Sequence, residues 1–298
     1  MVNQPIILDG KLTAEAYRAQ LKIQVAELVS AGIQPCLAVI LVGDNPGSVS
    51  YVRGKELDCI EIGILDRFQR FPATLAEAEL LDLVDGLNND PTVHGILVQL
   101  PLPSHINEQK VIERIDPAKD VDGFHPINVG KMLLGHDCYL PCTPYGVIKM
   151  LEYWNIETAG KHVVVCGRSN IVGKPMAALL TRKGRFADAT VTVCHSKTID
   201  LARYTRDADI LIAAMGQAAL ITADMIKPGA VVIDVGVNRI ADASKKSGTR
   251  LVGDVDFVGA CTVASAITPV PGGVGLMTRA MLLHNTVQAA RRRLEAGI

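Results

Sequence analysis

Three side chains near the start of the chain have a spacing that places them on one face of a helix. Ser48, Tyr51 and Lys55 recur at intervals of three and four residues within SVSYVRGK, and residues so spaced are neighbours on a helix surface. A tyrosine ring and a lysine amine would then meet, and a lysine whose pKa is lowered in a partly dry site can carry protons. The ordinary alternative is a lysine stem that lies on an aromatic ring at the surface.

A second stretch, Gly160 to Pro175 (GKHVVVCGRSNIVGKP), predicts a nucleotide site. Its valine-rich run, His162 to Cys166, is typical of a strand buried on both faces of a parallel sheet. Gly167 can adopt backbone angles that side chains forbid, and Gly173 would let the next helix pack closely, with free N–H groups directed at a phosphate. The pattern is one residue longer than G-x-G-x-x-G and has Ser169 at the middle glycine. An ordinary strand-to-helix turn is the alternative.

The end of the following strand, CHSKT, indicates which dinucleotide would bind. NAD-specific sheets usually place a carboxylate there, on the ribose hydroxyls, whereas this chain has His195, Ser196 and Lys197. Their donors and positive charge suit an additional phosphate, which Arg168 in the preceding turn could also reach. These residues favour NADP over NAD, and the alternative is a polar loop that simply follows a strand.

A metal site is not expected. His136, Cys138 and Cys142 lie close together in the sequence, but they supply three ligands and no obvious fourth. The seven cysteines, an odd number scattered from Cys36 to Cys261, do not resemble a disulfide framework in a chain of this size. A reducing compartment is the simpler expectation.

Length and charge limit the class of protein. At about 100 to 200 residues per domain, 298 residues indicate two domains, and two domains imply a cleft. With 30 Lys and Arg against 31 Asp and Glu the net charge is -1, which favours a small-molecule site over nucleic acid or a membrane surface. The first ten residues lack the pattern of a signal peptide and no apolar run is long enough to cross a membrane, so we expect a cytoplasmic protein.

Hydrophobic periodicity predicts alternating strands and helices in the first half. A helix from about Thr13 to Ala31, capped by Thr13, should bury one face, made of Tyr17, Leu21, Val25, Leu28 and Val29. The loop GDNPGS should open another helix. The other expected elements are a strand at Leu37 to Val42, a helix from a capping box of Thr74 and Glu77 to about Leu87, a strand at Gly95 to Val98 and a helix at Asn107 to Ile115. The polar loop DPAKDVDGFHP is predicted to line the cleft and not to be core.

The second half predicts a doubly wound parallel sheet. After a helix from Thr143 to about Trp154, helical stretches alternate with strands at Val163 to Cys166, Thr190 to Cys194, Ile210 to Ala213 and Val231 to Val235. We therefore expect an α/β protein with a Rossmann-type dinucleotide-binding domain at residues 143–275. Residues 1–142 would form a substrate and catalytic domain, completed by a C-terminal helix at 276–298.

The Tyr-x-x-x-Lys spacing also occurs in short-chain dehydrogenases. In those enzymes the pair follows the nucleotide turn within one domain, whereas Tyr51 and Lys55 precede Gly167. The order of the motifs excludes that assignment.

Several blocks match one other family together and in order: SYVRGK, GILVQLPLP, KDVDGFHPINVGK, PCTPYG, GRSNIVGKP, ATVTVCHSKT and TPVPGGVG. From about residue 40 to 285 the chain resembles the bifunctional methylenetetrahydrofolate dehydrogenase and methenyltetrahydrofolate cyclohydrolase. The resemblance implies that Lys55 is the catalytic lysine, Tyr51 its ring-stacking tyrosine, Gln99 the partner of the lysine and Asp122 the pterin-binding aspartate. It implies cofactor-binding roles for Gly167, Arg168, Ser169, Ile171, Gly173, His195, Ser196, Lys197 and Val237.

One position departs from that family. Leu276 stands where the family usually has the proline of PGGVGPMT, which puts the stiffness of this exit loop, and its fit to substrate, in question.

The resemblance implies two successive reactions on tetrahydrofolate derivatives, with or without polyglutamate tails, in a homodimer. NADP-dependent oxidation would convert 5,10-methylenetetrahydrofolate into the 5,10-methenyl compound, and hydrolysis would yield 10-formyltetrahydrofolate. The first step needs placement of the cofactor more than a base, because two nitrogens stabilise the cation that hydride removal leaves. The second needs a proton carrier, for which Lys55 is the candidate.

Two other classes of function stay open from the sequence. A two-domain NADP-dependent dehydrogenase of an amino or hydroxy acid would share the sheet and a lysine-bearing first domain. A non-catalytic NADP-binding sensor would have little use for Tyr51, Lys55 and Asp122 together. NADP-dependent turnover of methylenetetrahydrofolate would separate both from the folate enzyme.

Overall fold

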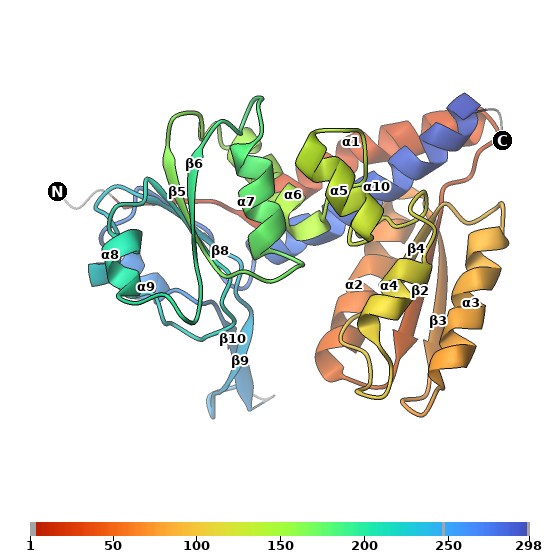
Figure 1. Cartoon of the computed structure of the whole chain (residues 1–298), viewed down its shortest axis with the longest axis horizontal. Coiled ribbons are helices and arrows are strands. Elements are labelled where there is room, and N and C mark those ends of the chain that lie inside the picture. The colour runs from red at the N-terminus through yellow and green to blue at the C-terminus, as the bar shows by residue number, and fades with distance from the viewer. Residues whose placement is uncertain (1–3, 246–247, 297–298) are drawn as a thin grey trace. The chain divides into compact units, whose positions relative to one another are not determined.

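The structure is a computed structural model and describes residues 4–245 and 248–296. The chain divides into two compact units, which are described separately (Figure 1). The first contains Thr143–Thr278 and the N-terminal residues up to Ala14, and the second contains Glu15–Cys142 and the chain from Arg279 onward. Parallel strands and helices alternate in both units, which confirms the predicted α/β class.

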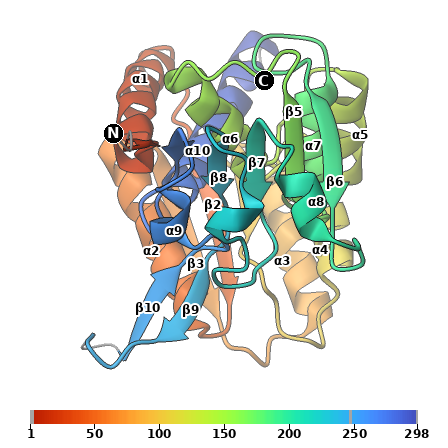
Figure 2. The same cartoon turned by 90° about the vertical axis from the view of Figure 1, so that its left-hand side faces the viewer.

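A six-stranded parallel sheet forms the centre of the first unit. Its strands are β1 (Ile6–Ile7), β5 (His162–Cys166), β6 (Thr190–Cys194), β7 (Ile210–Ala213), β8 (Val231–Asp234) and β11 (Ala266–Ile267). Their order is β1-β11-β8-β7-β5-β6, of which Figure 2 labels the strands β8, β7, β5 and β6. The chain passes from β5 to β6 on one side and then crosses to β7 on the other, so the strand order reverses between β5 and β7. Doubly wound sheets bind their ligands at the carboxyl ends of the strands at such a point.

Side chains cover both faces of this sheet, because Val163, Val164 and Val165 are all fully buried. Helix α7 (Gly173–Thr181) packs on β5 and β6 and buries Met176 and Leu179. The unit also contains α6 (Cys142–Tyr153), α8 (Leu201–Thr205), the short 3-10 helix η1 (Ala223–Met225), α9 (Phe257–Ala260) and an antiparallel pair of strands, β9 (Asn238–Ala241) and β10 (Thr249–Val252).

The second unit is built on a three-stranded parallel sheet. Its strands, in spatial order, are β3 (Leu65–Phe71), β2 (Cys36–Val42) and β4 (Gly95–Val98). Every residue of the central strand β2 is buried. The helices of this unit are α2 (Pro46–Ile62), α3 (Glu77–Asn89), α4 (Glu108–Arg114) and α5 (Pro126–Leu134). Helices α1 (Gly10–Ser30) and α10 (Val274–Ala296) each begin in the first unit and continue into the second.

The start of α1 differs from the prediction. Asp9, not Thr13, caps the helix, because its carboxylate accepts hydrogen bonds from the N–H groups of Lys11 at 2.7 Å and Leu12 at 3.1 Å. Thr13 lies inside the helix, is buried, and donates its hydroxyl proton to the Asp9 carbonyl at 2.8 Å. The predicted buried face was wrong at Val29, which is 45 % exposed.

Three further local predictions were wrong or incomplete. Helix α3 begins at Glu77 with Ala76 as its N-cap, so Thr74 does not cap it; the Glu79 carboxylate accepts from the Ala76 N–H at 3.2 Å. Strand β3 was not predicted, because as an edge strand it leaves much of LDRFQRF exposed and so lacks a clear apolar pattern. The exit loop is shorter than predicted: Leu276, where the predicted helix at 276–298 begins, lies in the first turn of α10, and its N–H donates to the Gly273 carbonyl at 3.3 Å.

Candidate active site

Helix α2 presents the lysine face that the sequence predicted. Asn45 caps the helix by accepting from the N–H of Gly47 at 2.9 Å and that of Ser48 at 3.2 Å, and Pro46 occupies the first turn. Ser48 and Lys55 are both buried. The Lys55 Nζ atom lies 4.7 Å from the centroid of the Tyr51 ring, so the predicted pair is in contact.

Gln99, which follows β4, fixes the amine of Lys55. The Lys55 Nζ donates to Gln99 Oε1 at 2.9 Å, and Gln99 Nε2 donates to the Leu100 carbonyl at 2.7 Å. The second bond orients the amide so that its oxygen faces the lysine. Lys55 is only 5 % exposed, and burial lowers its pKa while the Asp122 carboxylate opposes that change. An amine held this way can gain and lose a proton more readily than a surface lysine.

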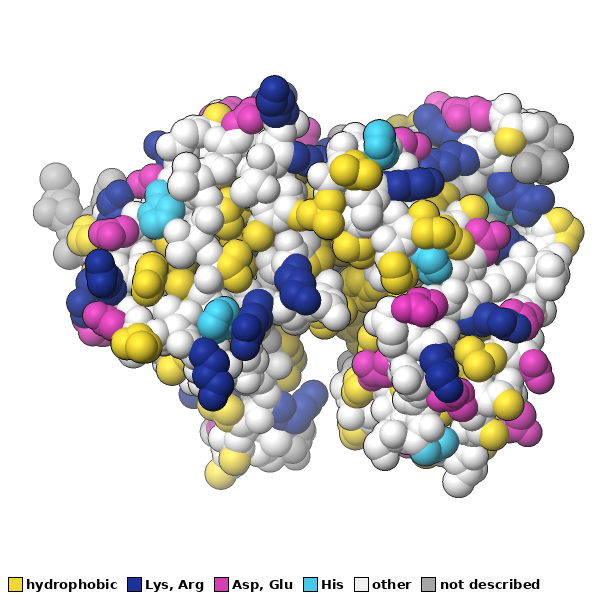
Figure 3. Space-filling model, in the orientation of Figure 1, with side chains coloured by type: hydrophobic (Ala, Val, Ile, Leu, Met, Phe, Trp, Pro, Cys, Tyr) yellow, Lys and Arg dark blue, Asp and Glu magenta, His cyan; other side chains and the backbone are white. Residues whose placement is uncertain are grey.

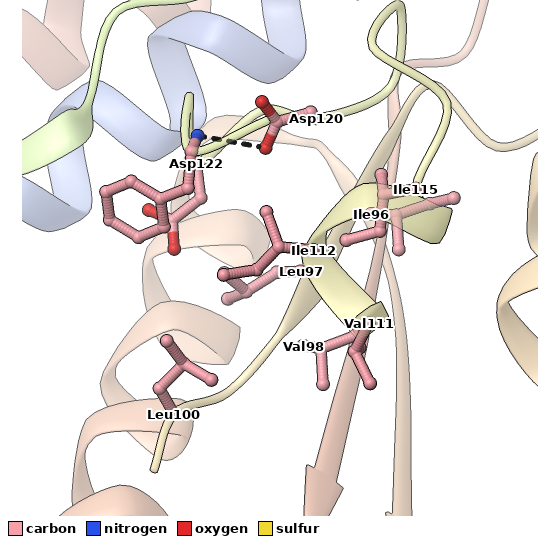
Figure 4. A pocket seen from close by; sticks show the side chains of 10 residues that line it. Ile96, Leu97, Val98, Leu100, Val111, Ile112, Ile115, Asp120 and Asp122 are labelled. Carbon is pink, nitrogen blue, oxygen red and sulfur yellow. Dashed lines mark hydrogen bonds between the residues drawn. The ribbon is translucent and has the colours of Figure 1, made fainter. Parts of the chain in front are cut away.

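Asp122 lies at one end of a pocket whose wall is mostly aliphatic. Figure 4 shows Asp122 and Asp120 above the side chains of β4 and α4. Burial raises the pKa of the Asp122 carboxyl, and the charge of Lys55 lowers it. The lining residues are Ile96, Leu97, Val98, Leu100, Val111, Ile112, Ile115, Asp120, Asp122 and Phe124. Of the predicted catalytic residues only Asp122 lines this pocket, and Tyr51, Lys55 and Gln99 are not part of its wall.

The neighbouring Asp120 organises the loop that carries Asp122, and the sequence analysis missed it. Its carboxylate accepts from the N–H of His125 and from Asn128 Nδ2, both at 2.8 Å, and from the N–H groups of Gly123 and Phe124. Burial is the main cause that raises its pKa to about 7. An acidic side chain a few residues before a glycine could have signalled a loop that folds onto its own carboxylate.

The loop DPAKDVDGFHP is therefore not wholly a solvent-facing lining, contrary to the prediction. Lys119 and Asp120 are both buried. The Lys119 amine donates to the carbonyls of Leu87 at 2.8 Å and of Asn88 and Asp90 at 2.7 Å, at the end of α3. The Leu87 and Asp90 carbonyls also accept from the N–H groups of Asp90 at 3.3 Å and Val93 at 3.2 Å, so the lysine adds a second donor to these two and satisfies that of Asn88.

The turn after β5 has the shape of a phosphate cradle that only glycine permits. Gly167 has φ +135°, and a Cβ there would overlap the Ala214 carbonyl oxygen at the end of β7. A Cβ on Gly173 would overlap the Gly167 carbonyl oxygen. The turn thus places backbone alone at the switch point of the sheet, as close approach of a pyrophosphate requires. The residues present fit a dinucleotide.

One detail of this turn differs from the prediction. The first N–H groups at the start of α7 are not free, since the Ser169 hydroxyl accepts from Val172 N at 3.1 Å and from Gly173 N at 3.4 Å. Lys174 N donates to the Ser169 carbonyl at 3.1 Å. Ser169 thus satisfies the helix start, and the exposed side chains around it are left to meet an anion.

The other predicted cofactor residues lie at the carboxyl ends of the strands. Arg168, Ser169 and Ile171 after β5, Ser196 and Lys197 after β6, and Val237 after β8 are exposed, and His195 is half-buried. Lys197 N donates to His195 Nδ1 at 3.2 Å. The nearest carboxylate after β6, Asp200, accepts from Arg203 N and caps α8. Figure 3 shows basic side chains on the visible face of this unit between α7 and the β9–β10 pair.

Two other features concern metals and membranes. Among residues 4–245 and 248–296, no group of three or more His, Cys, Asp or Glu side chains could hold a metal ion. Cys142 instead donates its thiol to the Val121 carbonyl at 3.3 Å. No helix in the described part of the chain is long and apolar enough to cross a membrane.

Comparison with known proteins identifies the family. Residues 8–122 match the family model of the tetrahydrofolate dehydrogenase/cyclohydrolase catalytic domain, and residues 141–294 match that of the tetrahydrofolate dehydrogenase/cyclohydrolase NAD(P)-binding domain. The chain belongs to the tetrahydrofolate dehydrogenase/cyclohydrolase family. This membership confirms the predicted family, its bifunctional enzyme class, and a fold that joins a catalytic domain to an NAD(P)-binding domain.

Individual relatives of the family are similar over nearly the whole chain. The bifunctional protein FolD of Geobacillus thermodenitrificans is 60 % identical over 286 residues, which cover 96 % of this chain and 97 % of the relative. The crystal structure of the Campylobacter jejuni bifunctional enzyme FolD is 51 % identical, with a TM-score of 0.91, and covers 96 % of this chain and 99 % of that one. The Trypanosoma brucei methylenetetrahydrofolate dehydrogenase-cyclohydrolase, solved with NADP and an inhibitor, is 41 % identical, with a TM-score of 0.92, and covers 97 % and 98 %.

Proposed function

We propose that this member of the family oxidises 5,10-methylenetetrahydrofolate to the 5,10-methenyl compound with NADP and hydrolyses the product to 10-formyltetrahydrofolate. The observation that carries the proposal is the buried amine of Lys55, held by Gln99 at 2.9 Å and facing the charge of Asp122. The names of the relatives support the two reactions, and the Trypanosoma brucei relative was solved with NADP.

The oxidation depends on binding and orientation. Bound NADP would accept the hydride from the carbon between the two nitrogens of the substrate. This chain anchors the aminopyrimidine edge of the pterin through Asp122, whose carboxylate can accept two hydrogen bonds. Tyr51 offers a ring face for stacking, and aliphatic side chains of β4 and α4 line the pocket beside Asp122.

The hydrolysis depends on a proton carrier. Water adds to the methenyl carbon, and one ring nitrogen must receive a proton as its bond to that carbon breaks. Lys55 supplies and recovers these protons, because burial lowers its pKa. Gln99 positions the amine without adding charge, since its side chain is neutral.

NADP selection rests on the residues around the glycine turn. Gly167 and Gly173 leave room for the pyrophosphate, and Arg168, Ser196 and Lys197 supply donors for the additional phosphate. Ser169 orders the turn, and Ile171, His195 and Val237 complete the set that we assign to the dinucleotide.

We propose that one domain binds the folate and the other binds NADP. We assign residues 1–142 and 276–298 to the folate domain and residues 143–275 to the NADP domain. The grouping of Glu15–Cys142 with the chain from Arg279 onward is close to this assignment, and the N-terminal residues up to Ala14 group instead with the NADP unit.

A homodimer accords with an apolar surface on the second unit. Leu57 and Ile60 of α2 are 58 % and 67 % exposed, and Leu65 and Phe68 of the edge strand β3 are also exposed. An apolar surface beside an unpaired strand edge is typical of a protein interface. Light scattering at micromolar concentration should report a dimer, and Ile60→Asp should shift it toward monomer. The substrate would be a tetrahydrofolate derivative with or without a polyglutamate tail. The protein would work in the cytoplasm.

A coupled assay tests the function directly. Methylenetetrahydrofolate and NADP are supplied, NADPH formation is followed, and decay of the methenyl compound is followed next. Both signals are expected from the purified protein. Oxidation of an amino or hydroxy acid without folate turnover would favour the alternative dehydrogenase, and NADP binding with neither signal would favour a sensor.

A further inference from the structure

Two buried carboxylates near the nucleotide turn have no part in the chemistry described so far. Asp234 ends β8 and is 3 % exposed, and Asp254 follows β10 and is fully buried. A buried carboxylate is stable only if donors surround it. The donors here come mainly from the backbone of loops at the carboxyl ends of the parallel strands.

Asp254 binds the loop that follows β7. Its Oδ2 accepts from Met215 N at 2.5 Å and Gly216 N at 2.9 Å, and its Oδ1 accepts from Gln217 N at 2.9 Å. Three successive N–H groups thus converge on one side chain. The remaining donor is Asn238 Nδ2, at 2.8 Å from Oδ1, at the start of β9. One carboxylate therefore joins the loop after β7 to the loop after β8.

Asp234 fixes the position of Asp254 through hydrogen bonds from the backbone. It accepts from Asp254 N and Val255 N, both at 2.9 Å, and from Gly236 N at 3.0 Å. Two glycines make room for the pair, because a Cβ on Gly236 would overlap the Asp254 carboxylate and a Cβ on Gly253 would overlap that of Asp234. The two acids and two glycines form one tightly fitted block.

The loops held by this block border the nucleotide turn. The residue before Met215 is Ala214, whose N–H donates to the Cys166 carbonyl at 2.8 Å and whose own carbonyl lies where a Gly167 Cβ would be. Val237, which is 61 % exposed, lies between Gly236 and Asn238. Both loops therefore stand at the carboxyl ends of β7 and β8, beside the switch point of the sheet.

We propose that Asp254 is a positioning residue for the NADP site, which fixes the loops after β7 and β8 through Met215, Gly216, Gln217 and Asn238. The inference rests on the proposed function for the identity of the nucleotide. Asp254 acts through backbone groups and does not touch the reacting atoms. Its loss should weaken NADP binding and leave hydrolysis, which uses Lys55 and needs no nucleotide, unchanged.

The test compares three variants in the full chain. Asp254→Asn keeps the shape but directs an NH2 group at two of the four donors, and Asn238→Ala removes a single bond at a half-buried residue. Asp209→Asn is the matched control, because Asp209 accepts from His162 N at 2.9 Å and Lys227 Nζ at 2.7 Å at the opposite, amino end of the same strands. NADP affinity is measured by titration calorimetry in the absence of folate. Cyclohydrolase activity is measured on supplied methenyltetrahydrofolate in the absence of NADP. The Tm of each variant is measured by scanning calorimetry.

Asp254→Asn is expected to raise the NADP Kd on the order of tenfold or more, and Asn238→Ala is expected to raise it about threefold. In both variants the cyclohydrolase rate should stay within about twofold of the unmodified rate. Asp209→Asn should change neither. An unchanged Kd in a folded Asp254→Asn would overturn the proposal, as would equal losses of both properties in Asp254→Asn and Asn238→Ala. If Asp254→Asn does not fold, Asn238→Ala decides by its Kd alone. Unmodified protein that binds NADP but does not oxidise methylenetetrahydrofolate would refute the proposed function, while the Kd comparison would still decide the role of Asp254.

Discussion

Arg279 of α10 closes a two-pronged ion pair on Asp58 of α2, one helical turn after Lys55. Arg279 Nε lies 2.6 Å from Asp58 Oδ2 and its second terminal nitrogen lies 2.7 Å from Oδ1. The Asp58 side chain is only 5 % exposed. A Cβ on Gly54 would overlap the guanidinium, so glycine lets the arginine lie against α2. The positive charge of Arg279 also lowers the pKa of Lys55, after burial as the main cause.

The first prediction separates the two effects of this pair. Arg279→Leu should leave Asp58 buried without a partner and cost about 3 to 5 kcal/mol of unfolding free energy. It should also raise the Lys55 pKa and shift the cyclohydrolase pH profile to higher pH. The double variant Asp58→Leu, Arg279→Leu should regain most of the stability and of the pH profile, because both charges are then absent. Equal stability of the single and double variants in urea would contradict the pairing.

Lys55→Met should separate the two reactions. Methionine keeps an unbranched apolar stem but carries no proton, so hydrolysis of the methenyl compound should fall by about 10² to 10⁴ or more. The methenyl product should accumulate wherever hydride transfer survives, which its absorbance in the coupled assay would show. Asp122→Ala is the contrasting variant and should impair both reactions, because both need the same anchored pterin. Hydrolysis by Lys55→Met at the unmodified rate would assign the proton transfer to another group.

Arg168→Ala should change the cofactor preference. A charge-assisted bond to phosphate contributes about 1.5 to 3 kcal/mol, so NADP affinity should fall roughly tenfold or more while NAD affinity changes little. Lys183→Ala, an exposed cation after the far end of α7, is the control and should alter neither. Titration of both nucleotides by calorimetry checks this. Parallel losses for NADP and NAD would show that Arg168 does not read the additional phosphate.

Asp120 should make stability depend on pH. Its pKa is about 7 in the folded chain, against 3.8 for an unperturbed aspartate, so the folded state binds its proton more tightly. The stabilisation from that proton is complete below about pH 4 and is lost as the pH rises through 7. Unfolding free energy from urea titrations at pH 5 and pH 8 should therefore fall less in Asp120→Asn than in the unmodified protein. Identical pH slopes would exclude this titration.

Features that depend on the local residue pattern could be predicted from the sequence. Features that depend on backbone groups far away in the chain could not. The spacing of the side chains predicted the buried strands around Val164 and Ile40, the glycine turn and the lysine face of α2. Strand β3 has no comparable pattern, because its polar residues suit an exposed edge and its pairing with β2 alone makes it a strand. Asp254 was also missed, because its donors lie 16 to 39 residues away in the chain and no spacing rule connects them.

The burial of residues in the loop around Asp122 could not be predicted from the sequence either. Its Asp, Pro and Gly residues predicted exposure, and composition alone gave no reason to expect otherwise. Lys119 is buried with its amine bonded to three carbonyls at and just after the end of α3, and Asp120 is buried because the loop folds onto its carboxylate. Which polar residue finds such partners depends on the tertiary fold.

Two lysines in the described part of the chain are buried and have lowered pKa values, and their hydrogen bonds give them opposite chemical reactivity. Lys119 commits all three ammonium protons to the carbonyls of Leu87, Asn88 and Asp90, so no lone pair becomes available without breaking that set. Lys55 donates to a single amide oxygen, and its neutral form is a nucleophile. An amine-directed acylating or aldehyde reagent that reaches the amine beside Gln99 should therefore modify Lys55 and spare Lys119, which makes the proton carrier itself the target of a covalent inhibitor.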